Sequence, residues 1–162
     1  MKKALTILIA LLIVIPASAR KTSFKFKGDD KSQTNEQAMA RGTFMVASQC
    51  PDCNNGYRLE QIRFAGFDKP GSSSTESFFI TNLTDRTMKG VNLYVEYLTP
   101  DGRQLHKRFL KLSCYIPPHE TRKADIKSWD TQRSFHYEKS QPSKHSSPFT
   151  VRFDPVAFYL AF

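Results

Sequence analysis

The chain has 162 residues, 40% of them hydrophobic, and a formal net charge of +9 at pH 7. This length is that of one domain with a real hydrophobic core rather than of several domains, and no internal repeat is present. The basic excess makes an acidic partner a hypothesis to be weighed below, but net charge does not specify a fold.

The first nineteen residues form an export signal by composition. Lys2 and Lys3 precede the apolar run Ala4–Ile15, and the small residues Ala17-Ser18-Ala19 follow it. This order predicts a signal peptide, residues 1–19, that is removed after export through the Sec pathway. A retained membrane anchor is the weaker interpretation, because the apolar run is short for a bilayer span. We therefore expect a periplasmic, surface-associated or secreted protein with no transmembrane segment after leader cleavage.

Residues 20–42 are polar and contain few large apolar side chains. Such a segment cannot bury enough surface to offset the entropy lost on ordering, so it predicts a flexible arm. A polyanion-binding tail is the alternative, because basic residues alternate with Phe24 and Phe26. The domain proper is expected to cover residues 43–162.

The segment Glu76–Ile116 predicts three strands joined by two turns. Alternate positions from Val91 to Tyr97 are apolar, as expected for a strand with one buried face. Thr99-Pro100-Asp101-Gly102 has the composition of a tight turn. In the returning strand the apolar phase changes near Arg108–Leu110, which predicts a β-bulge or a crossing between sheets there.

Further strands are expected on both sides of this segment. The final one changes phase at Pro155 and is interpreted as an edge or closing strand. Gly, Pro and Ser-rich turns separate the strands, and no segment outside the leader has a convincing helical period. The sequence therefore predicts an all-β fold, a single immunoglobulin-like β-sandwich of about seven strands. The other expected strands are Thr43–Ala47, Tyr57–Phe67, Thr121–Ile126 and residues 149–162.

Four stretches together resemble a group of small secreted proteins of Bacteroidales that have an immunoglobulin-like domain and no known function. They are GYRLEQIRFAGFDKP (Gly56–Pro70), ESFFITNLTDRTMKGVNLYVEYLTPDGRQLHKRF (Glu76–Phe109), IPPHETRKADIKSWD (Ile116–Asp130) and SFHYEKS (Ser134–Ser140). The hairpin Asn82–Gly102 is also similar to FxLYD-type domains. Both resemblances imply a fold and an address in the cell envelope, and neither implies catalytic residues.

The pair Cys50 and Cys53 is the sharpest local motif. In an exported protein a disulfide is the first expectation for this pair. A zinc site is the second, with Cys114 and either His106 or His119 as the remaining ligands. Thioredoxin-like redox chemistry is the third, although the surrounding segments predict strands and turns rather than the helix N-terminus that such chemistry uses.

Cys114 falls on the apolar face of its predicted strand, with Leu110, Leu112 and Ile116. A buried, unpaired thiol that packs as a small hydrophobic residue is therefore expected. A disulfide between Cys114 and one of the other two cysteines remains open.

The sequence lacks the motifs of common hydrolases and phosphate-binding enzymes, and its four histidines are scattered through polar segments. We therefore expect no enzymatic activity and no cofactor. The chain is expected to be an envelope or surface interaction module that binds an unknown envelope protein or a glycan.

A basic contact face is the other candidate, formed by Arg103, His106, Lys107, Arg108 and Lys111 on the returning strand. Such a face favours a polyanionic glycan, while nucleic acid is an unlikely partner for an exported protein. The same residues have a structural explanation, because lysines commonly protect the edges of sheets from aggregation.

Overall fold

A computed structural model describes residues 24–25, 43–47 and 56–162 of the chain. Strands make up most of the described part, and one short 3₁₀ helix, η1, precedes β3. The predicted signal peptide, most of the polar arm and the Cys50–Cys53 pair lie outside the described residues. The strands are β1 (Phe24–Lys25), β2 (Thr43–Ala47), β3 (Ile62–Asp68), β4 (Thr75–Asn82), β5 (Met88–Leu98), β6 (Gln104–Ile116), β7 (Thr121–Lys127), β8 (Phe135–Tyr137) and β9 (Ser147–Ala161), with η1 at Leu59–Gln61.

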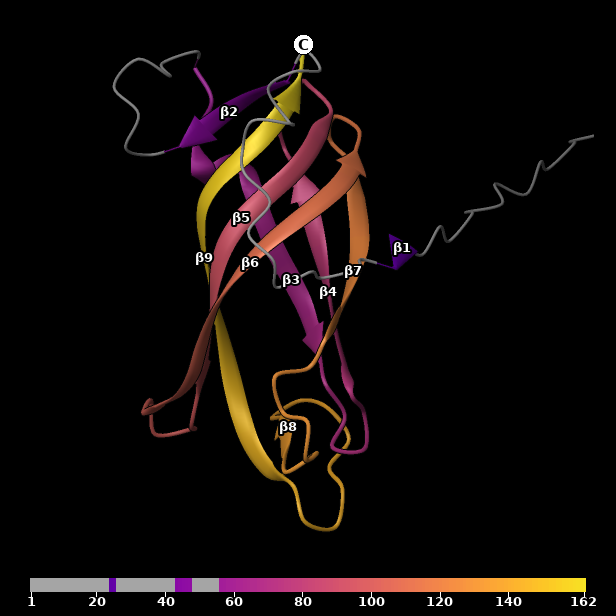
Figure 1. Cartoon of the computed structure of the whole chain (residues 1–162), viewed down its shortest axis with the longest axis vertical. Helices are drawn as coiled ribbons and strands as arrows, with labels where there is room; N and C mark the ends of the chain where they lie inside the picture. Colours follow the sequence, from indigo (N-terminus) through magenta and orange to yellow (C-terminus); the bar gives the residue numbers. More distant parts are fainter. Residues whose placement is uncertain (1–23, 26–42, 48–55) are drawn as a thin grey trace, which may run out of the picture.

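Two sheets pack face to face, which confirms the predicted all-β sandwich (Figure 1). One sheet has the strand order β1-β7-β4-β3, and the other has the order β2-β9-β5-β6, with the short β8 parallel to β9. In the described part of the chain no helix is long and apolar enough to cross a membrane.

Strands β3 to β9 follow the immunoglobulin order. The neighbours β3, β4 and β7 correspond to strands A, B and E, and the neighbours β6, β5 and β9 correspond to C′, C and F. The place of the last strand, G, next to F, is taken by β2, which comes before all of these strands in the chain and runs antiparallel to β9. The sequence alone does not predict this use of an early strand.

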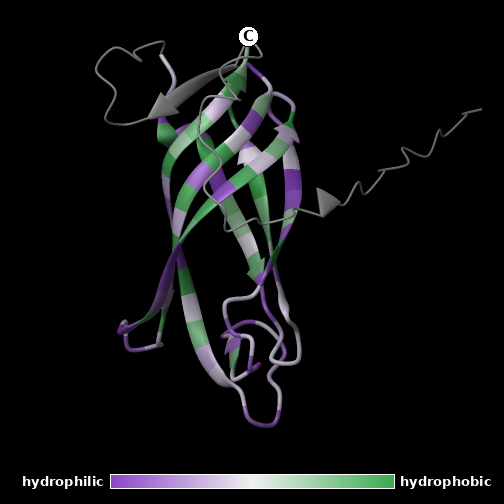
Figure 2. Cartoon of the chain, viewed as in Figure 1, coloured by the Kyte–Doolittle hydropathy of each residue, from purple (hydrophilic) through white to green (hydrophobic). Residues whose placement is uncertain are grey.

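The core forms between the two sheets because alternate residues of each strand point inward. The predicted run from Val91 to Tyr97 is confirmed, since its odd-numbered side chains are fully buried. Phe78 and Ile80 of β4 meet them from the opposite sheet, and Phe78 also contacts the ring of Phe153 at a centroid distance of 4.9 Å. Figure 2 shows the resulting alternation of hydrophobic and hydrophilic residues along the strands.

The predicted turn between β5 and β6 is confirmed. The amide of Gly102 donates to the carbonyl of Thr99 at 2.8 Å, and the positive φ of Gly102, 85°, is a conformation that glycine adopts without steric cost. Upstream, the predicted strand at Tyr57 begins only at Ile62, because residues 59–61 form the 3₁₀ turn η1.

The predicted bulge at Arg108–Leu110 is wrong. The ladder between β5 and β6 keeps one register from Gly90–Ser113 to Tyr97–His106, and its irregularities lie beyond these two pairs. The inward positions of β6 stay in one alternation, but two of them carry the polar residues His106 and Arg108. The sequence of apolar residues is interrupted for this reason, without a bulge.

The final strand, β9, does contain the irregularity expected at Pro155. Its register with β5 shifts where Asn92 pairs with Ala157 and Leu93 pairs with Pro155, so that Val156 is an extra residue. Of the two roles expected for it, an edge or a closing strand, the edge is wrong, because β9 lies between β2 and β5. In its second half Ala157, Phe158 and Leu160 are buried, while Val156 is exposed.

Replacing Phe78 with alanine should lower the free energy of unfolding by about 3–5 kcal/mol, because the side chain is fully buried among other aromatic rings. Urea denaturation of the purified protein measures the loss. Phe79→Ala is the matched control, since Phe79 points the other way and is 43% exposed. Equal losses in the two variants would contradict the assigned faces of β4.

Candidate functional site

Glu76 is a fully buried acidic residue of β4, and the hydrogen bonds to its carboxylate connect the two sheets. Its carboxylate accepts hydrogen bonds from the hydroxyl of Tyr97 at 2.6 Å, from Nη2 of Arg108 at 2.8 Å and from the amide of Trp129 at 3.1 Å. Burial, and then the neighbouring carboxylate, raise the pKa of Tyr97 far above its ordinary value of 10, so the phenol stays a donor. The charge and all three donors thus serve to hold the sandwich together.

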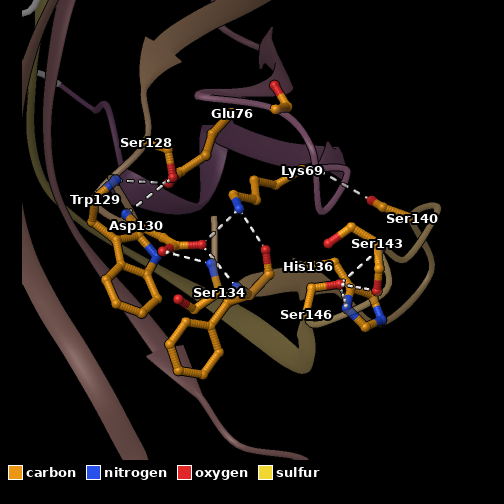
Figure 3. A network of polar contacts seen from close by, with 12 residues as sticks. Lys69, Glu76, Ser128, Trp129, Asp130, Ser134, His136, Ser140, Ser143 and Ser146 are labelled. Atoms are coloured by element: carbon orange, nitrogen blue, oxygen red, sulfur yellow. Dashed lines mark hydrogen bonds and ion pairs between the residues drawn. The ribbon is translucent and has the colours of Figure 1, made fainter. Parts of the chain in front are cut away.

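A second buried ion pair organises the loop after β7 (Figure 3). Lys69 is fully buried, and its ammonium lies 2.8 Å from Oδ2 of Asp130 and donates to the carbonyl of Phe135. Burial alone would raise the pKa of Asp130, but hydrogen bonds from Lys69 and from the amides of Ser134 and Phe135 outweigh it and lower the pKa. This arrangement closes the loop around the lysine.

Ser146 and His136 form the only contact in this network that resembles a catalytic pair, with Oγ and Nδ1 2.9 Å apart. The hydroxyl also accepts from the amide of Ser143 and donates to its carbonyl. A Cβ atom on Gly71 would lie 2.6 Å from the same oxygen, so backbone covers it. A nucleophile needs room for the carbon it attacks, and the geometry therefore assigns this pair to loop structure.

The predicted basic face does not form as one surface. His106 and Arg108 point inward, where His106 stacks on the ring of Trp129 at a centroid distance of 5.1 Å and Arg108 also donates to the carbonyl of Lys127. Burial, followed by the charge of Arg108, lowers the pKa of His106. The other three residues, Arg103, Lys107 and Lys111, are exposed.

The outward side of β5 and β6 instead carries exposed aromatic rings. Tyr94 and Phe109 are directly paired across the two strands, with centroids 5.0 Å apart, and they are 37% and 39% exposed. Tyr115, six residues further along β6, is 56% exposed. Together with Lys89, Lys107 and Lys111, these rings are named here the outer face.

Lysines lie over two of these rings. The ammonium of Lys107 is 4.8 Å from the centroid of Tyr94, and that of Lys89 is 4.6 Å from the centroid of Tyr115. Lys107 also pairs with Glu96 at 2.7 Å, and Arg152 of β9 pairs with the same carboxylate. The hydrogen bond from Lys107, with that from Arg152, lowers the pKa of Glu96. The outer face therefore presents apolar rings with a cationic margin.

Cys114 is a free thiol that packs partly buried against the core. Burial raises the pKa of its thiol to about 12, so the reactive thiolate is strongly disfavoured. His106 lies eight residues away on the same extended strand, roughly 26 Å at about 3.3 Å per residue, so these two cannot ligate one zinc ion. Within residues 56–162 and the two short strands before them, no group of three or more His, Cys, Asp or Glu is placed to hold a metal ion.

Comparison of the chain with protein-family models, with curated proteins and with solved structures gives no match in any of the three. The resemblance to secreted proteins of Bacteroidales and to FxLYD-type domains therefore stays a prediction from the sequence. The function has to be argued from the chain's own surfaces.

The outer face was not predicted from the sequence. Alternation divides the residues of a strand between two faces, but it does not say which of the two faces the second sheet covers. A signal was nevertheless present. Tyr94 stands six residues before Pro100 and Phe109 stands seven residues after Gly102, so a hairpin with one extra residue in the returning strand makes them a cross-strand pair.

Replacing Glu76 with glutamine should cost about 3 kcal/mol, because it leaves Arg108 without its counter-charge in a mostly buried place. The double variant Glu76→Gln/Arg108→Met should lose less than the sum of the two single losses, as measured by urea denaturation. Glu120→Gln, which breaks an exposed ion pair with Arg122, is the control and should change stability by about 0–1 kcal/mol. Strictly additive losses at Glu76 and Arg108 would contradict the coupling.

The lowered pKa of His106 predicts that stability falls as the pH drops below the ordinary histidine value of 6.5. The unfolded chain takes up the proton more readily than the folded one, so protons favour unfolding, and this effect is absent above that pH. His106→Gln should therefore reduce the change in the urea midpoint between about pH 7.5 and pH 5.5. If the urea midpoint of the variant changes with pH as much as that of the unmodified protein, other groups cause the pH dependence.

Proposed function

We propose that the protein is an exported, non-catalytic β-sandwich that binds another component of the cell envelope, a protein or a glycan, through the outer face of β5 and β6. The supporting observation is the set of exposed rings on one side of β5 and β6, which consists of the contacting pair Tyr94 and Phe109 and of Tyr115 further along β6. Aromatic side chains gathered on an exposed surface are typical of recognition sites, because they bury much area with little loss of side-chain freedom.

The placement of the rings supports binding over simple solvation. Tyr94 belongs to β5, which is paired on both sides by β6 and β9, so its backbone is held rigidly. Lys107 restrains the ring from above while it is itself paired with Glu96. A partner would therefore meet side chains that are already ordered, which reduces the entropy cost of association.

A second candidate function is the binding of a polyanionic glycan. It is favoured by the margin of Lys89, Lys107 and Lys111 beside the rings and by the net charge of +9. The alternative of a redox-active or zinc-binding envelope factor depends on Cys50 and Cys53, which lie outside the described residues. Thiol titration and metal analysis of the purified protein decide that alternative.

The test compares Tyr94→Ser/Phe109→Ser with the unmodified protein, each immobilised and exposed to solubilised native envelope. Retained proteins and sugars are quantified by mass spectrometry. Removal of these two rings should reduce the retained amount of the specific partner about tenfold or more, since truncating hot-spot residues costs upward of about 2 kcal/mol of binding free energy. Phe79→Ser, which removes a comparably exposed ring from the other sheet, should retain it.

Retention of the same molecules in equal amounts by the outer-face variant, with its fold verified by circular dichroism, would contradict the proposal. The dependence of binding on salt concentration distinguishes the two candidate functions. Binding to a purified acidic polysaccharide that disappears between about 50 and 500 mM salt would support the polyanion function, because such salt shortens the screening length severalfold. Binding of the partner that survives high salt favours the aromatic surface.

A further inference from the structure

We infer that the strand position beside β9 accepts β2 of a second copy of this chain in place of the chain's own β2. Reciprocal exchange of β2 then links two copies into a dimer. This inference does not depend on the binding function of the outer face.

The topology is the first argument. Strands β3 to β9 make up the two sheets in the immunoglobulin order, but the place beside β9 is filled from the other end of the chain. In the described structure the only strand partner of β2 is β9, and β2 stands at the end of its sheet. Strand β2 is thus an added strand rather than one of the alternating strands of the sandwich.

The covered part of β9 is the second argument. Strand β2 pairs with Ala157–Ala161, and the register places Phe44 opposite Leu160 and Val46 opposite Phe158. Phe158 and Leu160 are fully buried in the core. Without a strand at this place, the backbone groups of β9 facing it would be unpaired next to the core, so the site requires an occupant.

The length of the connection is the third argument. Eleven residues, 48–58, separate the end of β2 from η1 at Leu59. A chain of this length can extend about 35–40 Å, which reaches a neighbouring molecule without changing β3 to β9. The strand β2 makes the same five residue pairs with β9 of its own chain and with β9 of a second copy. Exchange therefore costs little free energy beyond the entropy lost when two copies associate.

Both arrangements use the same backbone pairing, so a disulfide across it reports which copy supplies the strand. Thr43 and Ala161 are opposite each other in the register, and paired strand residues have Cα atoms at distances that a disulfide can bridge. The double variant Thr43→Cys/Ala161→Cys tests the pairing itself. A mixture of the two single variants can form the same bond only between copies.

The single variants are mixed, incubated at high concentration in mild denaturant, returned to buffer and oxidised. We expect a disulfide-linked dimer whose digest contains the peptide joining residues 43 and 161, found by mass spectrometry. Each single variant treated alone is the control for dimers formed through the natural cysteines, and it cannot give this peptide.

Two results would overturn the inference. If the double variant forms the bond within one chain but the mixture never yields the joined peptide, β2 does not exchange. If the bond forms in neither experiment, β2 does not pair with β9 in this register at all. A further substitution, Met45→Pro/Val46→Pro, removes whichever of these two adjacent amides faces β9, so it should abolish the dimer in an otherwise unchanged mixture.

Discussion

The buried carboxylate of Glu76 is the constraint on which much of this sandwich depends. A charge removed from water needs partners of opposite sign and hydrogen-bond donors, and Glu76 obtains them from β5, β6 and the segment after β7. This requirement explains why Arg108 interrupts the inner face of β6. It also fixes the positions of the two sheets relative to each other, since a shift of either sheet would leave charges unpaired in the interior.

The sequence is sufficient for the fold class because alternation is a local property. The buried run from Val91 to Tyr97 and the turn at Gly102 each depend on residues close in the chain. The pairing of β2 with β9 joins residues more than a hundred positions apart, and that of β5 with β9 joins residues more than fifty apart, which no local pattern encodes. The register of β6 was misjudged for a related reason, because Arg108 is acceptable inside only when Glu76 comes from the other sheet.

The same reasoning applies to the candidate site. Five basic residues in one strand look like one surface in the sequence, but alternation separates them, and His106 and Arg108 lie partly buried on the inward side of β6. What is left outside is a mixed surface in which lysines lie over tyrosine rings. The exposed aromatic rings, rather than the positive charge alone, are therefore the more specific feature of this surface.

The inner position of β9 has a consequence for the timing of folding. Residues 147–161 pair with β5, β2 and β8, so one sheet lacks its middle until these residues have been made. Contacts of such large sequence separation form slowly, because a long loop must close before they contribute. During synthesis the chain thus remains without a closed core until β9 has been added, and it is unfolded when the cellular machinery first handles it.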